Sequence, residues 1–220
     1  MTLVPLGDQA WLVRCADERA AIRLANAIRV EAPFWLDDVL PAYATVGVYY
    51  DNRRVSRGAV EAWLKAFKPS SVPATPGRSI KIPVCYEQGP DLPFAAELLK
   101  RSEDELIRLH LKTEYTVYAI GFVPGFPYLG YLPNELTGVP RLATPRTRVE
   151  PGSVGITGRQ TGIYPLSRPG GWPLIGRTPL TIVDPDEGFF PISVGDRIRF
   201  ERIDDSEFRK RFGERLVTSS

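Results

Sequence analysis

Residues 121–182 read GFVPGFPYLGYLPNELTGVPRLATPRTRVEPGSVGITGRQTGIYPLSRPGGWPLIGRTPLTI, and this stretch decides the fold of the second half of the chain. It holds 11 of the 19 glycines, 10 of the 21 prolines and six arginines, but no lysine. Glycine permits backbone angles that side chains forbid and proline fixes φ, so their dense mixing with aromatic residues predicts a rigid surface with many turns. Short apolar runs between such turns extend from Val117 to Phe200, a pattern typical of a compact β-barrel or sandwich.

The residues before this stretch predict a different architecture. Residues 2–15 contain two strand-like runs around a Gly-Asp turn, which indicates a hairpin. Two amphipathic helices follow, with Asp17 and Ser56 as their N-caps, and the alternating residues 43–50 predict a strand between them. The expected order is ββαβα, with a further strand possible near residues 35–40.

A domain boundary is expected in the sequence KPSSVPATPGRS, residues 68–79, which has three prolines, three serines and little to bury. We therefore expect an α+β protein with an N-terminal α/β domain at residues 1–77 and a second domain, with the barrel or sandwich pattern, at residues 78–205. Residues 206–220 are expected to form a C-terminal tail with one or two helical turns.

Composition narrows the class of partner. The 28 basic residues are matched by 26 acidic ones, a net charge of +2, and this predicts no nucleic-acid partner. The N-terminus has neither a signal-peptide pattern nor an apolar run long enough for a membrane span, so we expect a cytoplasmic protein with no membrane partner. Cys15 and Cys85 lack a CxxC spacing or a nearby histidine, which predicts two buried free thiols and no metal site.

Groups for autonomous hydrolysis are scarce. Hydrolysis needs a nucleophile with a base, a carboxylate pair or a metal-activated water, and the chain has one histidine, His110. His110 is the one weak candidate for a general base; the alternative is a histidine that packs at a helix end and bonds a nearby carbonyl. Neither a P-loop nor a GxGxxG motif occurs, so no catalytic residue or nucleotide site is assigned from a motif.

The same stretch is rich in arginine and poor in acids, since only Glu135 and Glu150 are acidic between residues 121 and 182. Arginine suits planar, bidentate recognition of a carboxylate or a phosphate, although Arg141, Arg159 and Arg168 could instead only hold turn carbonyls. Neutral hydrogen-bonding residues lie on glycine-rich backbone beside them. The candidate substrate-binding residues are Arg146, Arg148, Gln160, Thr161, Tyr164, Trp172, Arg177 and Thr178.

The segment GFVPGFPYLGYLP places aromatic residues around two turns formed by glycine and proline. A partner protein could bury such an aromatic ridge, or the ridge could plug the barrel as part of its core. The candidate interface residues are Phe122, Phe126, Tyr128 and Tyr131.

Four motifs, GFVPGFPYLGYL, PRLATPRTRVEPGSVGI, QTGIYPLSRPGGWPLIGRTP and VGDRIRF, resemble the family of 5-oxoprolinase B subunits, which includes the kinase inhibitor KipI and proteins called allophanate hydrolase subunit 1. The resemblance covers nearly the whole chain. It implies an N-terminal two-layer α/β domain and a C-terminal cyclophilin-like β-barrel. It also implies partners, the C and A subunits of 5-oxoprolinase, with which such a chain opens 5-oxoproline to L-glutamate at the expense of ATP.

Three other functions stay open from the sequence. A KipI-like protein would dock on a sensor histidine kinase and inhibit it. An allophanate hydrolase subunit would rely on a partner for chemistry, because the chain has no amidase-type serine-lysine signature. A peptidyl-prolyl isomerase is suggested only by analogy with the barrel, and fold does not imply function.

Overall fold

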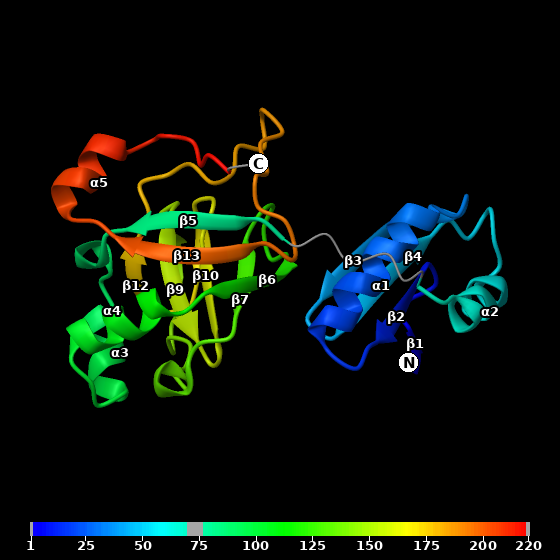
Figure 1. Ribbon diagram of the computed structural model, residues 1–220, viewed down its shortest axis with the longest axis horizontal. Coiled ribbons are helices and arrows are strands. Elements are labelled where there is room, and N and C mark those ends of the chain that lie inside the picture. Colours follow the sequence, from blue (N-terminus) through cyan, green and yellow to red (C-terminus); the bar gives the residue numbers. More distant parts are fainter. Residues whose placement is uncertain (1, 70–76, 219–220) are drawn as a thin grey trace. The chain divides into compact units, whose positions relative to one another are not determined.

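The computed structural model describes residues 2–69 and 77–218. The chain divides into two compact units, residues 1–76 and residues 77–220 (Figure 1). Most of the expected linker, residues 70–76, lies outside the described residues. No helix in the two described ranges is long and apolar enough to cross a membrane.

The first unit is a four-stranded antiparallel sheet with two helices. Its strand order is β1-β2-β4-β3, so the hairpin of β1 and β2 lies beside the hairpin of β3 and β4. The elements are β1 (Thr2–Pro5), β2 (Ala10–Arg14), α1 (Glu18–Glu31), β3 (Leu36–Ala42), β4 (Thr45–Tyr50) and α2 (Arg57–Ala66). The additional strand that the sequence allowed near residues 35–40 is therefore present as β3.

Local capping explains where the two helices begin. The Asp17 carboxylate accepts a hydrogen bond of 2.6 Å from the backbone N–H of Ala20, and the Ser56 hydroxyl accepts one of 3.3 Å from Ala59. Both helices bury their apolar stripes in one core with alternate residues of the strands, Val46 and Val48 among them. The expected caps and helical stripes are confirmed.

The second unit is built on a seven-stranded sheet of order β12-β9-β10-β7-β6-β13-β5. Its strands are β5 (Ser79–Val84), β6 (Tyr115–Ile120), β7 (Pro127–Gly130), β9 (Ser153–Thr157), β10 (Gln160–Ile163), β12 (Leu174–Arg177) and β13 (Arg197–Arg202). β13 runs parallel to β5, and the other neighbours are antiparallel. Cys85 and Arg177 exchange two backbone hydrogen bonds of 2.9 Å, which join the two edge strands into a nearly closed barrel.

Helices and a small two-stranded ribbon accompany this barrel, and Figure 1 shows α3, α4 and α5 beside its sheet. They are η1 (Tyr86–Gln88), α3 (Leu92–Leu98), α4 (Glu103–Lys112), η2 (Asn134–Leu136), α5 (Asp205–Arg211) and the two-stranded ribbon of β8 (Arg146–Val149) with β11 (Arg168–Gly170). The α+β class and the β-barrel are confirmed.

A partly buried ion pair anchors the start of β5 to the turn before β13. The Asp196 carboxylate lies 2.6 Å from the Arg78 guanidinium and accepts backbone hydrogen bonds from Arg78 at 3.0 Å and Ser193 at 2.8 Å. Asp196 is almost fully buried, so these donors replace the water that its charge would otherwise need.

The C-terminal residues differ from the expected separate tail at 206–220. Phe208 of α5 packs against Cys85 and Ile203, and Leu216 is buried in the main barrel core. Leu216 also donates a backbone hydrogen bond of 3.0 Å to Thr181. Phe208 and Leu216 are apolar side chains in a mostly charged segment, and both are buried against the barrel. Residues 206–218 are therefore part of the second unit.

Candidate functional site

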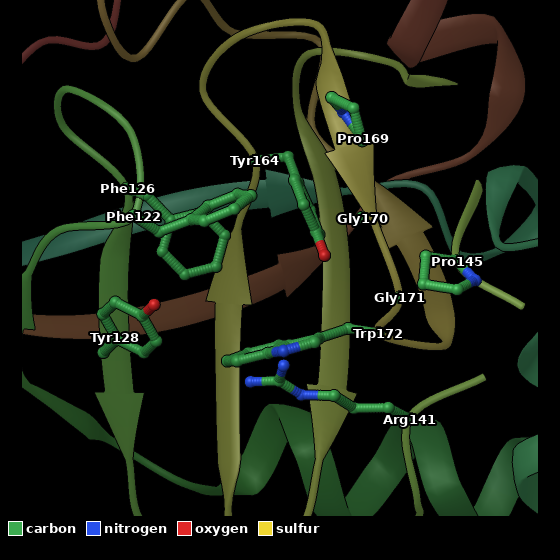
Figure 2. A pocket seen from close by; sticks show the side chains of 10 residues that line it. All are labelled: Phe122, Phe126, Tyr128, Arg141, Pro145, Tyr164, Pro169, Gly170, Gly171 and Trp172. Atoms are coloured by element: carbon green, nitrogen blue, oxygen red, sulfur yellow. The ribbon is translucent and has the colours of Figure 1, made fainter. Parts of the chain in front are cut away.

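The second unit contains a cavity of about 230 Å³ with predominantly aromatic walls (Figure 2). Its residues come from the β6–β7 connection, β7, the segment before β8, the residue after β10, β11 and the β11–β12 connection. The lining residues are Phe122, Phe126, Tyr128, Arg141, Pro145, Tyr164, Pro169, Gly170, Gly171 and Trp172.

Phe126 is the centre of the aromatic cluster. Its ring meets those of Tyr128, Tyr164 and Trp172 edge-to-face, with centroid distances of 4.9, 5.2 and 5.5 Å. Such edge-to-face contacts are a favourable geometry for aromatic pairs. Phe126 is only 1% exposed, whereas Phe122 at the same cavity is 59% exposed, so the cluster runs from the protein interior to solvent.

Glycines in the strands make room for these rings. A Cβ atom on Gly162 would lie 2.8 Å from the Phe126 ring, and one on Gly170 would lie 2.6 Å from the ring and hydroxyl of Tyr164. Real Cβ atoms essentially never approach other atoms this closely. The glycine density of the stretch therefore seats aromatic side chains against the strands.

Arg141 supplies the charge of the cavity. Of the six arginines between residues 121 and 182, five have a protein partner: Arg146 pairs with Asp91, Arg148 pairs with Glu150, Arg159 lies over the ring of Tyr131, Arg168 donates to the carbonyl of Ser167, and Arg177 donates to that of Pro151. Arg141 makes no hydrogen bond, ion pair or ring contact of this kind with any residue in the described ranges. Figure 2 shows its side chain extending beneath the Trp172 ring.

Two phenols lie in the field of this guanidinium. Burial raises the pKa of Tyr128, and the positive charge of Arg141 acts in the opposite direction. Burial also raises the pKa of Tyr164, while the nearby backbone of Trp172 and the charge of Arg141 act in the opposite direction. Both phenols therefore keep their protons at neutral pH and can donate hydrogen bonds.

The cavity as a whole can hold a small ligand that combines an apolar ring with a negative charge. The aromatic walls favour burial of the ring, the unpaired guanidinium favours a carboxylate, and the phenols offer neutral donors. Among the described residues, no three His, Cys, Asp or Glu side chains gather as metal ligands would.

Comparison with known proteins identifies the family. The family model described as carboxyltransferase domain, subdomain C and D, matches residues 1–190, a range that includes the whole cavity. The chain belongs to this family.

Characterised relatives of this carboxyltransferase-family chain are named as the B subunit of 5-oxoprolinase. The protein from Bacillus subtilis (strain 168) is 35% identical over 226 residues, which cover 92% of this chain and 93% of that protein. The protein from Escherichia coli O157:H7 is 40% identical over 193 residues, which cover 86% of this chain and 87% of that protein. The resemblance to the family of 5-oxoprolinase B subunits is confirmed, and the name designates one subunit of an assembly.

Solved structures agree on the fold. The crystal structure of TTHA0988 is 39% identical with a TM-score of 0.79 over 89% of this chain, which spans 40% of that longer chain. The urea carboxylase of Kluyveromyces lactis matches 99% of this chain, and 24% of its own, with a TM-score of 0.76. At 16% identity the second likeness shows the fold alone.

The predicted site residues of this family member are divided between the cavity and other places. Tyr164 and Trp172, predicted to bind substrate, line the cavity together with Phe122, Phe126 and Tyr128, predicted to bind a partner. The two hypotheses about these aromatic residues therefore concern one surface.

Arg146 does not line the cavity, but its positive charge acts on the Tyr164 phenol. Its Nη2 lies 2.7 Å from Asp91 Oδ1, and Asp91 Oδ2 accepts the backbone N–H of Leu174 at 2.7 Å. This pair ties β8 to the start of α3 and to β12 beside Trp172. Nη1 of Arg146 is buried and has no hydrogen-bond partner among the described residues, so the guanidinium is held on one side only.

The remaining predicted residues do not line the cavity. Arg148 is exposed and pairs with Glu150, while Gln160 begins β10 opposite Gly130. Arg177 lies near the rings of Phe208 and Phe212 of the α5 region, and Thr178 is buried, where its hydroxyl accepts from Leu180. The Arg159 guanidinium carbon lies 4.5 Å from the centroid of the Tyr131 ring. The centroids of the Tyr131 and Tyr118 rings are 5.4 Å apart.

His110 and Thr161 lie in the barrel core and not at the cavity. His110 is fully buried and stacks on Phe200 at 4.6 Å, and its Nδ1 lies 2.7 Å from the Tyr86 hydroxyl. Its Nε2 lies 3.1 Å from the hydroxyl of Thr161, which donates onward to the carbonyl of Gly155 at 3.0 Å. Because the Thr161 hydroxyl donates its proton to the Gly155 carbonyl, it can only accept from His110. Nε2 of His110 therefore carries the proton and donates to Thr161, and Nδ1 accepts from the Tyr86 hydroxyl.

Burial lowers the pKa of His110 to about 3, so the imidazole is neutral. The packing alternative fits this geometry better than a general base, although hydroxyl groups take the place of the expected carbonyl. Thr161 is fully buried between strands and cannot touch a ligand in this structure.

Sequence reasoning missed the importance of Arg141 and of the backbone at Pro169, Gly170 and Gly171. From the sequence, Arg141 is one of three arginines that could hold turn carbonyls, and all three lie in similar Gly/Pro-rich surroundings. Arg141 is set apart only in the folded chain, where it lines the cavity and has no partner of its own among the described residues. One signal was available, because Arg141 lies between two prolines that fix the segment before β8.

Proposed function

We propose that this chain is the B subunit of an ATP-dependent 5-oxoprolinase, which opens 5-oxoproline to L-glutamate, and that it acts only together with the A and C subunits. The names of relatives that match 92% and 86% of the chain support this assignment. ATP is the cofactor of the assembled enzyme in this proposal.

The claim that the chain does not act alone rests on one observation. The chain has a pocket of the size of a small ligand, but neither its imidazole nor its buried thiol is reactive. The only imidazole of the chain is buried and neutral in His110. Burial raises the pKa of the Cys85 thiol to about 11, and the Glu87 carboxylate beside it adds to this. A thiol with such a pKa is a weak nucleophile at neutral pH.

The test is reconstitution from purified components. The chain and the A and C subunits are assayed singly, in pairs and together for release of glutamate from 5-oxoproline, with and without ATP. We expect glutamate only from the complete mixture with ATP. Full activity of the lone chain, or an inactive complete mixture of folded components, would refute the proposal. Ammonia release from allophanate by the same mixture would instead favour the allophanate hydrolase function.

A KipI-like inhibitor is a second candidate, favoured by the exposure of Phe122. This side chain is 59% exposed at the rim of the cavity, on a residue with a φ of 67°. A large exposed aromatic residue beside a pocket is the kind of anchor that protein interfaces bury. If this function holds, excess chain should inhibit autophosphorylation of a sensor histidine kinase, and Phe122→Ser should relieve that inhibition. Unchanged autophosphorylation in excess chain would exclude it for that kinase.

A further inference from the structure

We propose that the aromatic cavity is a binding site for a small ring-bearing monocarboxylate, with Arg141 holding the carboxylate and the Phe122, Tyr128 and Trp172 rings packing on the ligand ring. The choice of 5-oxoproline as that ligand rests on the proposed function. The existence of a site for this chemical class rests on the cavity itself.

The charge of the ligand follows from the pairing of the arginines. Arg146, the other guanidinium close enough to influence the cavity phenols, is held by Asp91. Arg141 lines the cavity and has no partner of its own in the described ranges. One unpaired guanidinium matches one carboxylate through two parallel hydrogen bonds. A phosphate dianion or a nucleotide would carry more charge than this cavity compensates.

The size and shape of the ligand follow from the walls. The cavity volume of about 230 Å³ lies below the roughly 300–1,000 Å³ typical of pockets for drug-sized ligands. Its walls are aromatic rings and prolines, which favour contact with a compact apolar face. A single five- or six-membered ring fits this description, and a long flexible chain would lose more conformational entropy on entering it.

Neutral hydrogen-bond donors complete the site. The Tyr128 hydroxyl makes no hydrogen bond with any residue in 2–69 or 77–218, and its raised pKa keeps the proton in place. It is therefore available to a carbonyl oxygen on the ligand ring. The Tyr164 hydroxyl also lines the cavity, and its raised pKa keeps its proton available to a ligand. A lactam carbonyl is one group that such donors recognise.

Binding to the purified full-length chain tests the inference. Isothermal titration calorimetry is performed with 5-oxoproline, with 2-pyrrolidinone, which lacks the carboxylate, and with L-glutamate, which lacks the ring. We expect 5-oxoproline to bind, and both analogues to bind at least about 10-fold more weakly, because each loses one half of the recognition. Equal binding of 2-pyrrolidinone would overturn the role of the charge, and equal binding of glutamate would overturn the role of the ring.

Variants locate the site. Arg141→Gln should weaken 5-oxoproline binding about 10- to 100-fold, the effect of losing a charged hydrogen bond. Arg159→Gln is the matched control, because that guanidinium lies over Tyr131 outside the cavity, and its affinity should equal that of the wild type. Trp172 is the only tryptophan after residue 77, so ligand-induced change in tryptophan emission should disappear in Trp172→Phe. Equal affinities of wild type and Arg141→Gln would overturn the inference.

The failures of the two proposals are distinguishable. The KM for 5-oxoproline is measured in the reconstituted mixture with wild-type and Arg141→Gln chains, whose folding is checked by circular dichroism. An active mixture with an unchanged KM would overturn this site and leave the proposed function standing. Carboxylate binding by the lone chain, combined with an inactive complete mixture, would support the site and refute the proposed function.

Discussion

The buried histidine should make the stability of the second unit depend on pH in a way that one substitution removes. The pKa of His110 is about 3 in the folded protein, against 6.5 for an unperturbed imidazole. Below pH 6.5 the unfolded chain takes up a proton that the folded chain refuses, so stability is full above pH 6.5 and falls as the pH decreases towards 3.

The expected magnitude follows from the same two pKa values. One pH unit in this window corresponds to about 1.4 kcal/mol, so the 1.5 units between pH 6.5 and pH 5 remove about 2 kcal/mol of unfolding free energy. Ordinary carboxylates titrate near pH 4, below this window. The chain contains no other histidine, so no second imidazole contributes to the change.

His110→Gln is the diagnostic variant. Its amide oxygen can accept from Tyr86 and its amide nitrogen can donate to Thr161, as the two ring nitrogens do, but it does not titrate. Losing the stack on Phe200 should lower stability by about 1 to 3 kcal/mol at pH 8. The further loss between pH 8 and pH 5 should then be absent.

The assay must report on the second unit, because two compact units can unfold in separate steps. Urea denaturation at pH 8 and pH 5 is followed by hydrogen exchange of peptides from β6 and β10, which lie in that unit. If wild type and His110→Gln lose the same free energy between these pH values, the reasoning about the buried imidazole is wrong.

Four further outcomes are expected. Gly170→Ala should lower the stability of the second unit by about 1 to 3 kcal/mol in urea denaturation, because the new Cβ would lie 2.6 Å from the ring of a buried tyrosine; the adjacent Gly171→Ala, whose nearest atom would lie at 3.5 Å, should change it by less than about 0.5 kcal/mol, and equal losses would contradict the steric argument. Asp196→Ala should cost about 1 to 3 kcal/mol, since the donors of Arg78 and Ser193 lose a nearly fully buried acceptor, whereas Glu201→Ala, which breaks an exposed ion pair, should cost less than about 1 kcal/mol in the same experiment. In the folded protein iodoacetamide should label the partly exposed Cys15 before the buried Cys85, and peptide mass spectrometry measures both rates. Equal labelling rates would mean that the barrel opens readily. The affinity for 5-oxoproline should stay constant between pH 5 and pH 8, because the two phenols that line the cavity keep their protons there, and a calorimetric affinity that changed with pH would contradict this prediction.

Sequence predicts those features that depend on neighbours along the chain. Capping by Asp17 and Ser56 acts over three residues, so it is visible in the sequence and is confirmed by hydrogen bonds to the helix N-termini. The turn-rich barrel is visible for the same reason. His110 is ambiguous in the sequence because its partner Thr161 lies 51 residues away, and no local pattern places the two in one core.

The charge of one segment, counted by itself, is misleading. Only two acids lie between residues 121 and 182, so the segment looks strongly cationic in the sequence. In the folded chain Asp91, 55 residues from Arg146, reaches the segment from outside and neutralises that guanidinium. The role of the glycines is hidden in the same way, because the close approach of Gly162 to Phe126 arises only when β10 lies beside β7.

These two corrections together sharpen what the cavity can recognise. Glycines that seat aromatic rings give rigid walls, because the rings fill the space where side chains would otherwise stand. Most arginines of the stretch already bind the protein's own carboxylates and carbonyls, so much of its positive charge is compensated within the protein. What remains is one guanidinium, Arg141, against a preformed apolar surface. A rigid wall favours ligands of matching shape, and a single guanidinium favours ligands with a single negative charge. This geometry therefore favours a small ring with one carboxylate over a nucleotide or an open-chain diacid.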